Sequence, residues 1–390
     1  MKRLRLAVLV CAVLVAMVAT TSPVSAASTR RVSPSGADSG DCSSSPCRTI
    51  GYAVSRAAAG DRIVVAGGTY LETVLVTKRL SLIGSSQRNG EDDEDGAHES
   101  SAGSAATIDA TGHDNGVVIK GAAAAGTVLR GFTVRNALLE GVFATQTSRL
   151  TIANNHLLDN DKLWNPVNVP LPCRSADDCG EALHLDSVSN SSLVANLIEK
   201  NVGGILLTDE TGPTFGNTIQ GNQVLNNDKD CGITLASHAF NPGRPVTATE
   251  GGIYNNKVLH NIAIGNGSAG IGIFAGPPGA AAYGNDVIGN VTKRNGLPGV
   301  AIHAHSPFQY VNDNRIVANE IEGNGADPDA GTGAPTGITV WSAVVSIPRT
   351  VIAANKISDE YFGIFTVKAV QLVGLETNRY DNVTVHTSIH

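Results

Sequence analysis

The ten residues TIQGNQVLNN, at positions 218–227, contain the pattern that decides the fold: an aliphatic residue, two spacers, an asparagine, one spacer, and the same unit again. The four positions are Ile219, Asn222, Val224 and Asn227. Recurrence of such a unit at intervals of tens of residues is typical of a repeat protein. Further copies begin at Ile152, Leu193, Ile253, Val287, Ile316 and Ile352. An incomplete copy surrounds Asn378. An earlier and weaker copy has Gly131 at the position of its asparagine. The first asparagines of successive copies are separated by 41, 26, 34, 34, 29, 36 and 23 residues.

A second motif is interleaved with the first, and it consists of a glycine followed by aliphatic residues at every other position. It occurs as GVFAT, GILLT, GITLA, GIGIF, GVAIH, GITVW and GIFTV, and EALHLD at 181–186 is a copy without its glycine. This alternation is typical of a strand with one buried face. One such unit cannot bury its apolar face alone, whereas stacked copies can.

We therefore predict an all-β fold, a right-handed single-stranded parallel β-helix of roughly nine to eleven coils. The repeated asparagines would bond to one another from coil to coil, and glycines would supply the backbone freedom that the bends require. The inner face would carry aliphatic stacks that include Leu183, Leu185, Ile205, Leu207, Ile233 and Leu235.

The segment before the repeats has a different pattern. Ile50, Ala53, Val54 and Ala57 follow helical spacing, and Gly60 closes the run. Read as TI…A…A…GD.I.V..GTY.E, the segment resembles the N-terminal cap of secreted pectate-lyase-like β-helix proteins, and the resemblance covers essentially the whole mature chain as a fold. It implies a cap segment with an α-helical cap at residues 27–60 and a β-helix domain at 61–390. Because that superfamily includes lyases, hydrolases, epimerases and non-catalytic members, the resemblance does not choose an activity.

Residues 1–26 have the features of a secretory signal peptide: a basic start, an apolar stretch from Leu6 to Ala19, and a small-residue cleavage site at 24–26. The apolar stretch is too short to favour a membrane span. Its removal takes away three basic residues and no acidic one, so the net charge falls from −7 to −10. We therefore expect a secreted, extracellular protein with neither nucleic-acid nor membrane partners, which require basic patches.

Five cysteines remain after this cleavage. Cys42 and Cys47 are close enough in sequence to form a disulfide, as are Cys173 and Cys179, which suits an exported chain. Cys231 is left over, and we expect a buried free thiol there.

Outward-facing residues of the glycine-led strands should form one row, because neighbouring coils lie about 4.8 Å apart and inner and outer side chains alternate. The fourth residue after each glycine is, in turn, Thr145, Asp186, Thr208, Ala236, Phe274, His303, Trp341 and Val367. The next two positions add Asp209, Glu210, Ser237, His238 and His305, and His184 lies two residues before Asp186. Carboxyl groups, imidazoles and aromatic rings thus gather on one row. Long connections at 161–180, 239–250, 277–283 and 306–312 are expected to wall a groove along it.

The order of the acids and imidazoles is similar to that of polygalacturonase-type glycoside hydrolases, in which an Asp, an adjacent acid pair and a His come from successive coils. The resemblance implies that one member of the pair Asp209–Glu210 protonates the leaving oxygen and that Asp186 helps to activate water. His238 would tune the acid or hold substrate, and His184 beside Asp186 completes the predicted catalytic set. The family's Asn-Thr-Asp is HLD here, its Asp-Asp pair is Asp-Glu, its Gly-His-Gly is SHA, and its Arg-x-Lys substrate clamp has no counterpart, which argues against pectic substrates.

The chemistry of the row also favours this assignment without the resemblance. Adjacent carboxylates in a partly desolvated groove repel each other, which raises the pKa of one of them and lets it act as an acid near neutral pH.

His303, His305, Phe274, Trp341 and Trp164 are predicted to bind substrate, the rings as platforms for sugars; packing against loops is the alternative for Phe274 and Trp341. The pair His303-x-His305 places two imidazoles on one face of a strand, as a metal site requires. No third ligand at a recognisable spacing accompanies it, so no metal site is predicted.

We conclude from the sequence that the chain is a secreted carbohydrate-active enzyme that cleaves a polysaccharide or oligosaccharide, with glycoside hydrolysis favoured and no cofactor. One alternative is a polysaccharide lyase or uronate C5-epimerase, in which His238 or His303 abstracts a proton while Asp186, Asp209 and Glu210 hold Ca²⁺. Another is a non-catalytic carbohydrate- or metal-binding β-helix protein that uses His184, His238, His303 and His305.

Overall fold

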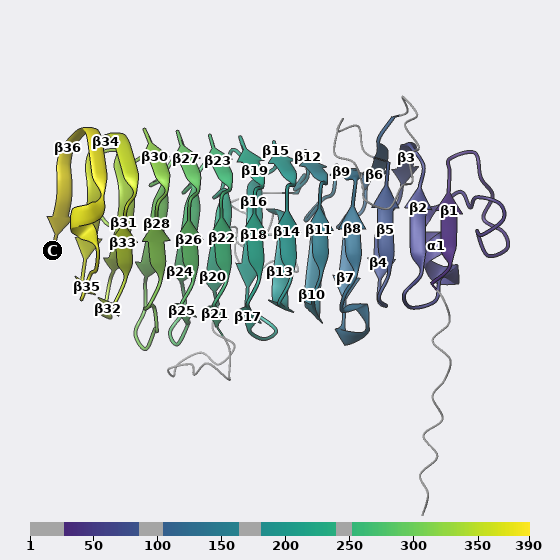
Figure 1. Cartoon of the computed structure of the whole chain (residues 1–390), viewed down its shortest axis with the longest axis horizontal. Helices are drawn as coiled ribbons and strands as arrows, with labels where there is room; N and C mark the ends of the chain where they lie inside the picture. Colours follow the sequence, from purple (N-terminus) through teal and green to yellow (C-terminus); the bar gives the residue numbers. More distant parts are fainter. Residues whose placement is uncertain (1–26, 86–103, 164–180, 239–251) are drawn as a thin grey trace, which may run out of the picture.

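The computed structural model describes residues 27–85, 104–163, 181–238 and 252–390, in which the chain winds into one rod (Figure 1). The strand pairs described between successive coils are parallel, and each strand pairs with its counterpart one coil further on. Eleven strands form the first sheet of the described residues. The predicted all-β parallel β-helix is confirmed.

Three columns of strands run along the rod, and they are named here by the sheet or face that they form. The first sheet contains β1 (Thr29–Val32), β2 (Arg62–Val65), β5 (Ser81–Gly84), β8 (Val128–Arg130), β11 (Thr151–Ala153), β14 (Ser192–Val194), β18 (Thr218–Gln220), β22 (Lys257–Leu259), β26 (Asp286–Ile288), β29 (Arg315–Val317) and β33 (Val351–Ala353). The second column, called the site face below, contains β4 (Val74–Val76), β7 (Val117–Lys120), β10 (Val142–Ser148), β13 (Glu181–Ser189), β16 (Gly203–Thr208), β20 (Ile233–Ser237), β24 (Ile271–Ala275), β28 (Val300–Ala304), β31 (Thr336–Ser342), β34 (Lys356–Val367) and β36 (Arg379–Ile389).

The third column joins the site face at β34, which is long enough to pair with both. It contains β3 (Gly68–Leu71), β6 (Ala106–Asp109), β9 (Phe132–Arg135), β12 (His156–Leu158), β15 (Leu197–Glu199), β19 (Gln223–Leu225), β23 (Ile262–Ile264), β27 (Val291–Lys293) and β30 (Glu320–Glu322). Short strands complete the coils: β17 (Thr214–Phe215), β21 (Ile253–Tyr254), β25 (Ala282–Tyr283), β32 (Ile347–Pro348) and β35 (Ala369–Val370). Two single turns of 3₁₀ helix are η1 (Ala122–Ala124) and η3 (Leu375–Thr377).

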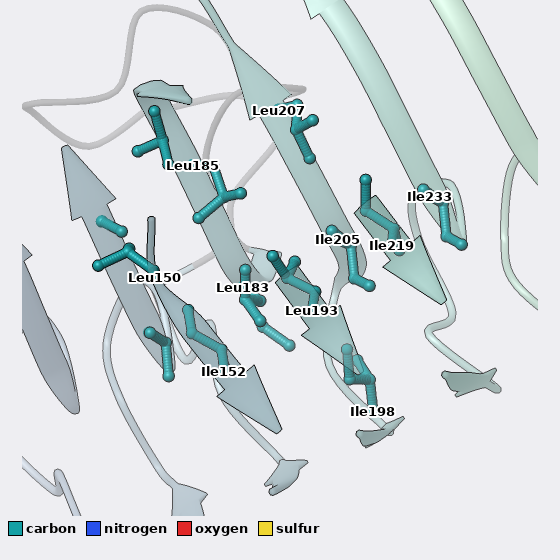
Figure 2. Close-up of a cluster of buried hydrophobic side chains, with 14 of the residues drawn as sticks. Leu150, Ile152, Leu183, Leu185, Leu193, Ile198, Ile205, Leu207, Ile219 and Ile233 are labelled. Atoms are coloured by element: carbon teal, nitrogen blue, oxygen red, sulfur yellow. The ribbon is translucent and has the colours of Figure 1, made fainter. Parts of the chain in front are cut away.

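The interior of the rod is a set of aliphatic stacks. Leu183 pairs in register with Ile205, and Ile205 with Ile233, while Leu185, Leu207 and Leu235 form the neighbouring stack. All six side chains predicted to point inward are fully buried. Figure 2 shows part of this core, in which side chains from β11, β13, β14 and β16 point into the same interior. Since burial of apolar area supplies the main favourable term in folding, these stacks hold the coils together.

Three ladders of buried asparagines support the bends. In each ladder the side-chain amide donates to the Oδ1 of the next coil's asparagine, as Asn222 does to Asn261 at 2.9 Å. The first ladder is Asn155, Asn196, Asn222, Asn261, Asn290, Asn319, Asn355 and Asn378; the second is Asn160, Asn201, Asn227, Asn266, Asn295, Asn324 and finally Glu360; the third is Asn217, Asn256, Asn285 and Asn314.

The predicted contact between repeated asparagines is confirmed, but the frame of one copy was wrong. The copy expected to begin at Ile253 placed Asn256 in the first ladder, whereas Asn256 bonds to Asn217 and Asn285 in the third. The first-ladder residue of that coil is Asn261, which lies 39 residues after Asn222. The asparagines of a coil recur every five residues, as in 217, 222 and 227, so a coil with three of them can be misread by one unit.

The residue before each ladder asparagine except Asn378 adopts a left-handed backbone conformation. Glycine provides it at Gly216 and Gly289, whereas Lys200, His260 and Ala318 adopt it with φ of 58°, 52° and 56°. The expectation that glycine serves the bends therefore holds for only some of them. Burial of the following asparagine in its ladder compensates for the strain of the others.

A helix, α1 (Ile50–Arg56), lies at the N-terminal end of the rod and contacts β1, β2 and β4. Its first amides are capped from two sides: Thr49 Oγ1 accepts from the Tyr52 N–H, and the Glu72 carboxylate accepts from Ile50 and Gly51 at 2.8 and 2.7 Å. The helix is where it was expected, while its role as a cap stays a prediction, as do the boundaries 1–26, 27–60 and 61–390. Within 27–60, β1 pairs with β2 and so belongs to the first sheet.

Cys42 and Cys47 form a disulfide, as predicted. Cys231 is a buried free thiol, and burial raises its pKa well above the ordinary value, so the thiolate is disfavoured. Cys173 and Cys179 lie outside the described residues, as do Trp164 and the first 26 residues. No helix in the part of the chain that the structure describes is long and apolar enough to cross a membrane.

Candidate functional site

The outward row on the site face has the predicted register. Thr145 pairs with Asp186, and Asp186 with Thr208. Further along, Ala236 pairs with Phe274, Phe274 with His303 and His303 with Trp341. Residues far apart in the sequence therefore lie one coil from each other, and they gather in two groups.

The first group, called the acid–imidazole cluster below, consists of Glu140, His184, Asp186, Thr208, Asp209, Glu210 and His238. It brings together all five residues predicted to be catalytic, and it adds Glu140 and Thr208. Its members come from the segment just before β10, from β13, from the end of β16 and its following turn, and from the residue after β20.

Asp186 is buried and fully engaged. Its Oδ2 accepts from Thr145 Oγ1 at 3.0 Å and from Thr211 Oγ1 at 2.6 Å, and its Oδ1 accepts from the Thr211 N–H at 3.1 Å. The carboxylate thus anchors the turn that follows β16. With 3 % of its surface exposed, Asp186 positions the neighbouring acid pair rather than meeting a substrate.

Asp209 is buried completely. Its Oδ1 accepts from the His238 N–H at 2.7 Å and its Oδ2 from Ser237 Oγ at 2.9 Å, so it holds the chain after β20 in place. Burial raises the pKa of this carboxyl to about 6, against the opposing effect of these two hydrogen bonds. The neutral form of Asp209 is therefore favoured in mildly acidic solution.

Glu210 and His238 are the partly exposed members of the cluster. Glu210 Oε1 lies 3.4 Å from His238 Nδ1, and their side chains are 13 % and 20 % exposed. A carboxylate beside an imidazole orients the ring. Both side chains of this pair are partly exposed, whereas the two aspartates are buried.

A relay of polar groups connects this pair to the interior. The Thr208 hydroxyl donates to Glu210 Oε2, and it accepts from His184 Nε2 at 2.8 Å. The other nitrogen of His184 lies 3.4 Å from Glu140 Oε1. Burial by itself lowers the pKa of His184, but the Glu140 carboxylate and the acids around it outweigh burial and raise that pKa. An imidazolium held between the Glu140 carboxylate and the Thr208 hydroxyl is therefore favoured.

The sequence did not identify Glu140, although a signal was present. Glu140 and Glu181 occupy the same position, the residue before the glycine of the strand motif or its equivalent. Strand alternation describes only the residues after that glycine, so it gives no direction for the side chain before it.

The second group, called the histidine cluster below, consists of His303, His305, Asp327, Asp329 and Trp341. His303 Nε2 donates to Asp327 Oδ2 at 2.8 Å, and His303 Nδ1 lies 3.6 Å from Asp329 Oδ2. His305 Nε2 lies 3.2 Å from the same Asp329 oxygen. Burial lowers the pKa of His303, but the two aspartates outweigh it and raise the pKa, and the bond from His303 lowers the pKa of Asp329 to about 2.

Asp327 and Asp329 were also absent from the sequence prediction. They lie in the DPDAG stretch after β30, which has no strand alternation to give their direction. Among the described residues His303, His305 and Asp329 are close enough to share one metal ion, because one ligand atom from each lies within 4.8 Å of the others.

The remaining predicted sugar contacts differ in their surroundings. The Trp341 ring lies 5.4 Å from both imidazoles of the histidine cluster and is half-buried. Phe274 packs against Cys231 and Ala301 and covers Gly272, where an added Cβ would lie 2.2 Å from its ring. Phe274 is half-buried as Trp341 is, and its ring lies 5.4 Å from the His303 imidazole. A role in sugar binding stays a prediction for both rings.

A stack of aromatic rings borders the connections after the site face, and the sequence reasoning missed it. Phe215, Tyr254 and Tyr283 are in register on β17, β21 and β25, with stacked rings whose centroids are 4.9 and 5.1 Å apart. Tyr310 meets Tyr283 edge-on at 5.1 Å. The ring faces that stack on one another are not available to sugars. The predicted groove walls at 161–180 and 239–250 lie largely outside the described residues, and the groove stays a prediction.

Comparisons with known proteins concern the fold. A family model described as a right handed beta helix region matches residues 98–291. No curated protein sequence matches the chain. Among solved structures, the A-module of the Azotobacter vinelandii mannuronan C-5 epimerase AlgE4 is similar at 14% identity with a TM-score of 0.54, covering 93% of this chain and 87% of that one. The A-module of AlgE6 from the same organism is similar at 13% identity with a TM-score of 0.50, covering 93% and 85%.

The catalytic domain of a GH87 alpha-1,3-glucanase in complex with tetrasaccharides is similar at 12% identity with a TM-score of 0.51, covering 88% of this chain and 64% of that one. At these identities the likenesses show the fold alone.

Proposed function

We propose, from the premise that this chain folds as a right-handed parallel β-helix, that it is an exported enzyme acting on a polysaccharide or oligosaccharide, with hydrolysis of a glycosidic bond as its reaction. The observation that carries the proposal is the Glu210–His238 pair, partly exposed on the site face and supported from below by Asp186, Asp209 and the Thr208 relay.

In this reaction Glu210 donates a proton to the glycosidic oxygen as the bond to the anomeric carbon breaks. A water molecule attacks that carbon, and the proton that it releases returns to Glu210 through His238, whose Nδ1 lies 3.4 Å from Glu210 Oε1. Asp209 fixes the backbone of His238, and Asp186 fixes the turn that carries Glu210, so these two act as positioning residues. General acid–base catalysis of this kind contributes roughly 10²–10⁴-fold to a rate.

A lyase or C5-epimerase acting on a uronate is the second candidate. Hydrolysis of a glycosidic bond commonly uses two carboxyl groups. Of the three acids predicted to be catalytic, however, only Glu210 has a partly exposed side chain, which favours a reaction that needs one carboxyl group and one imidazole. His238 would then abstract the proton next to the uronate carboxylate. In the lyase, a carbon–carbon double bond would form as the bond to the leaving oxygen breaks, and Glu210 would protonate that oxygen.

A panel of neutral and uronate-containing polysaccharides tests both candidates. Release of reducing ends without ultraviolet absorbance indicates hydrolysis, whereas an absorbing unsaturated product indicates a lyase. Glu210→Gln and His238→Gln should each lower the rate at least about 100-fold.

The chain contains a matched control. His156 and Glu199 form a second histidine–glutamate pair, at 3.0 Å, on β12 and β15 of the third column. Glu199→Gln and His156→Gln should leave the rate unchanged. Equal activity of the Glu210 variant and the parent on every digested substrate would remove the assignment.

A further inference from the structure

We propose that His303, His305 and Asp329 form a binding site for a divalent first-row transition-metal ion, best suited to Zn²⁺. The site belongs to the histidine cluster and does not depend on the proposed reaction of the acid–imidazole cluster. Ala236, Phe274 and His303 stand on successive coils, so the two clusters are about two coils, or roughly 10 Å, apart along the rod.

The three ligand atoms have the spacing of a zinc coordination shell. Zinc binds nitrogen and carboxylate oxygen at about 2.0–2.1 Å in tetrahedral geometry, so its ligand atoms lie about 3.3 Å from one another. Asp329 Oδ2 lies 3.2 Å from His305 Nε2 and 3.6 Å from His303 Nδ1, on either side of that value. All three atoms fall within 4.8 Å of one another.

Each imidazole is oriented through its other nitrogen. His303 Nε2 donates to the buried Asp327 carboxylate at 2.8 Å, and His305 Nδ1 donates to the Ala275 carbonyl at 3.1 Å. In the neutral rings, these bonds leave the lone pairs of His303 Nδ1 and His305 Nε2 directed at the Asp329 oxygen. Metal-binding histidines have this arrangement, with the second nitrogen donating to a carboxylate or a backbone carbonyl.

Nitrogen lone pairs repel a carboxylate oxygen that they face unless a proton or a metal ion lies between the nitrogen and the oxygen. A simple surface ion pair needs one imidazole and one carboxylate, as His156 and Glu199 illustrate. In the histidine cluster two rings converge on one oxygen, and each ring is held by a separate acceptor. A cation shared by the three atoms explains this convergence.

The ligand set also limits the choice of ion and leaves room for a further ligand. Imidazole nitrogens suit zinc and copper, whereas Ca²⁺ prefers six to eight oxygens. Three protein ligands leave the fourth position for water or a bound molecule. The His305 and Asp329 side chains are 34 % and 55 % exposed, so this position is reachable from solvent, beside the Trp341 ring.

Calorimetric titration of the purified chain, prepared without a histidine tag, tests the proposal with ZnCl₂, and CaCl₂ is run as the comparison ion. We expect one Zn²⁺ per chain and no binding of Ca²⁺. Asp329→Asn and His305→Gln should weaken zinc binding by about 100-fold or more, and Asp327→Asn should weaken it by about 10–100-fold by releasing His303. Substitution of Co²⁺ should give the visible absorption of a tetrahedral site, lost in Asp329→Asn.

Two variants serve as controls. Asp286→Asn removes a surface carboxylate that pairs with Arg315 at 3.1 Å, and His156→Gln removes an imidazole elsewhere on the rod. Both should bind zinc as the parent does. Because Asp329 is exposed, its variant should unfold in metal-free buffer at the temperature of the parent, which separates loss of a ligand from loss of the fold. Absence of stoichiometric zinc binding in the parent, or equal binding in Asp329→Asn and the parent, would overturn the proposal.

Discussion

Asp209 and Glu210 are adjacent in the chain, but their surroundings differ. The first points beneath the turn and is fully buried, whereas the second keeps part of its carboxylate exposed next to His238. Burial acts on Asp209 to raise its pKa to about 6. The Glu210 carboxylate shares the Thr208 proton. Two neighbouring acids can therefore serve different purposes, one structural and one chemical.

Asp209 should make the stability of the protein depend on pH. A carboxyl whose pKa is raised in the folded state stabilises the protein below its ordinary pKa of 3.8, and this contribution is lost as pH rises through 6. A shift of this size corresponds to about 3 kcal/mol. Asp209→Asn keeps an oxygen to accept from the His238 N–H, so the variant should be more stable than the parent above pH 6 by up to about that amount.

Urea unfolding of both proteins between pH 4 and 8 measures this difference. Asp286→Asn, on the surface, should follow the parent at every pH. If the parent and Asp209→Asn kept a constant difference in unfolding free energy over this range, ionisation of Asp209 would not be its source.

At this scale the sequence predicts which residues share a row, because strand alternation and the glycine register give every outward residue of β13, β16, β20 and β28 a definite neighbour. It does not predict their burial, since Asp186 and His184 are covered although they face outward. Nor does it predict partners from irregular segments, such as Glu140 and Asp329, whose directions follow from no periodic rule.

The asparagine ladders are the elements that fix the bends of the coils. Each side-chain amide accepts from the preceding coil and donates both to the following coil and to a backbone carbonyl, as Asn261 does to Asn290 and to the Ile219 carbonyl. Hydrogen bonds of buried amides are costly to leave unmade, so the ladders are strongly specified. The sequence predicted two of them. The third escaped because Asn256 was assigned to the first ladder and its other asparagines were not assigned to any copy of the repeat.

Glu360 ends the second ladder, and replacing it with glutamine should stabilise the protein. Its Oε1 accepts from the Asn324 N–H and from Asn324 Nδ2 at 2.9 and 3.0 Å. Burial raises the pKa of Glu360 to about 7, so its contribution to stability is present below pH 4.5 and is lost as pH rises through 7. Glu360→Gln keeps the accepting oxygen and removes the charge, and above pH 7 the gain should approach about 3 kcal/mol.

The melting temperature at pH 5 and pH 8 measures this gain, which should be larger at pH 8. Glu376→Gln, at an exposed position in η3, is the control and should shift neither value. A destabilised Glu360→Gln at pH 8 would show that the ladder needs the carboxylate itself.

For the whole molecule, each coil contacts only its neighbours along the rod. Stability in such a protein is a sum of coil and interface contributions, so a local defect should be felt locally. Leu235→Ala removes a fully buried side chain from β20 and should cost about 2–5 kcal/mol. Hydrogen exchange should then speed up in β16, β20 and β24, while β2 and β5 keep their protection.

Mass spectrometry of exchanged peptides measures this distribution. Leu225→Ala, a half-buried outward position on β19, should change exchange much less. Equal loss of protection in every coil would show that the rod unfolds as one unit.

The coils beginning at Asn256 and at Asn285 have the same length, since both steps along the third ladder span 29 residues. Excising residues 256–284 would join Asn255 to Asn285, seat Asn285 on Asn217, and close all three ladders again. The rod would become shorter by one coil, about 4.8 Å. The acid–imidazole and histidine clusters would come closer by that distance, and their own side chains would be unchanged. Insertion or excision of whole coils could therefore set the distance along the rod between the two clusters, and so the spacing at which they contact one bound polymer.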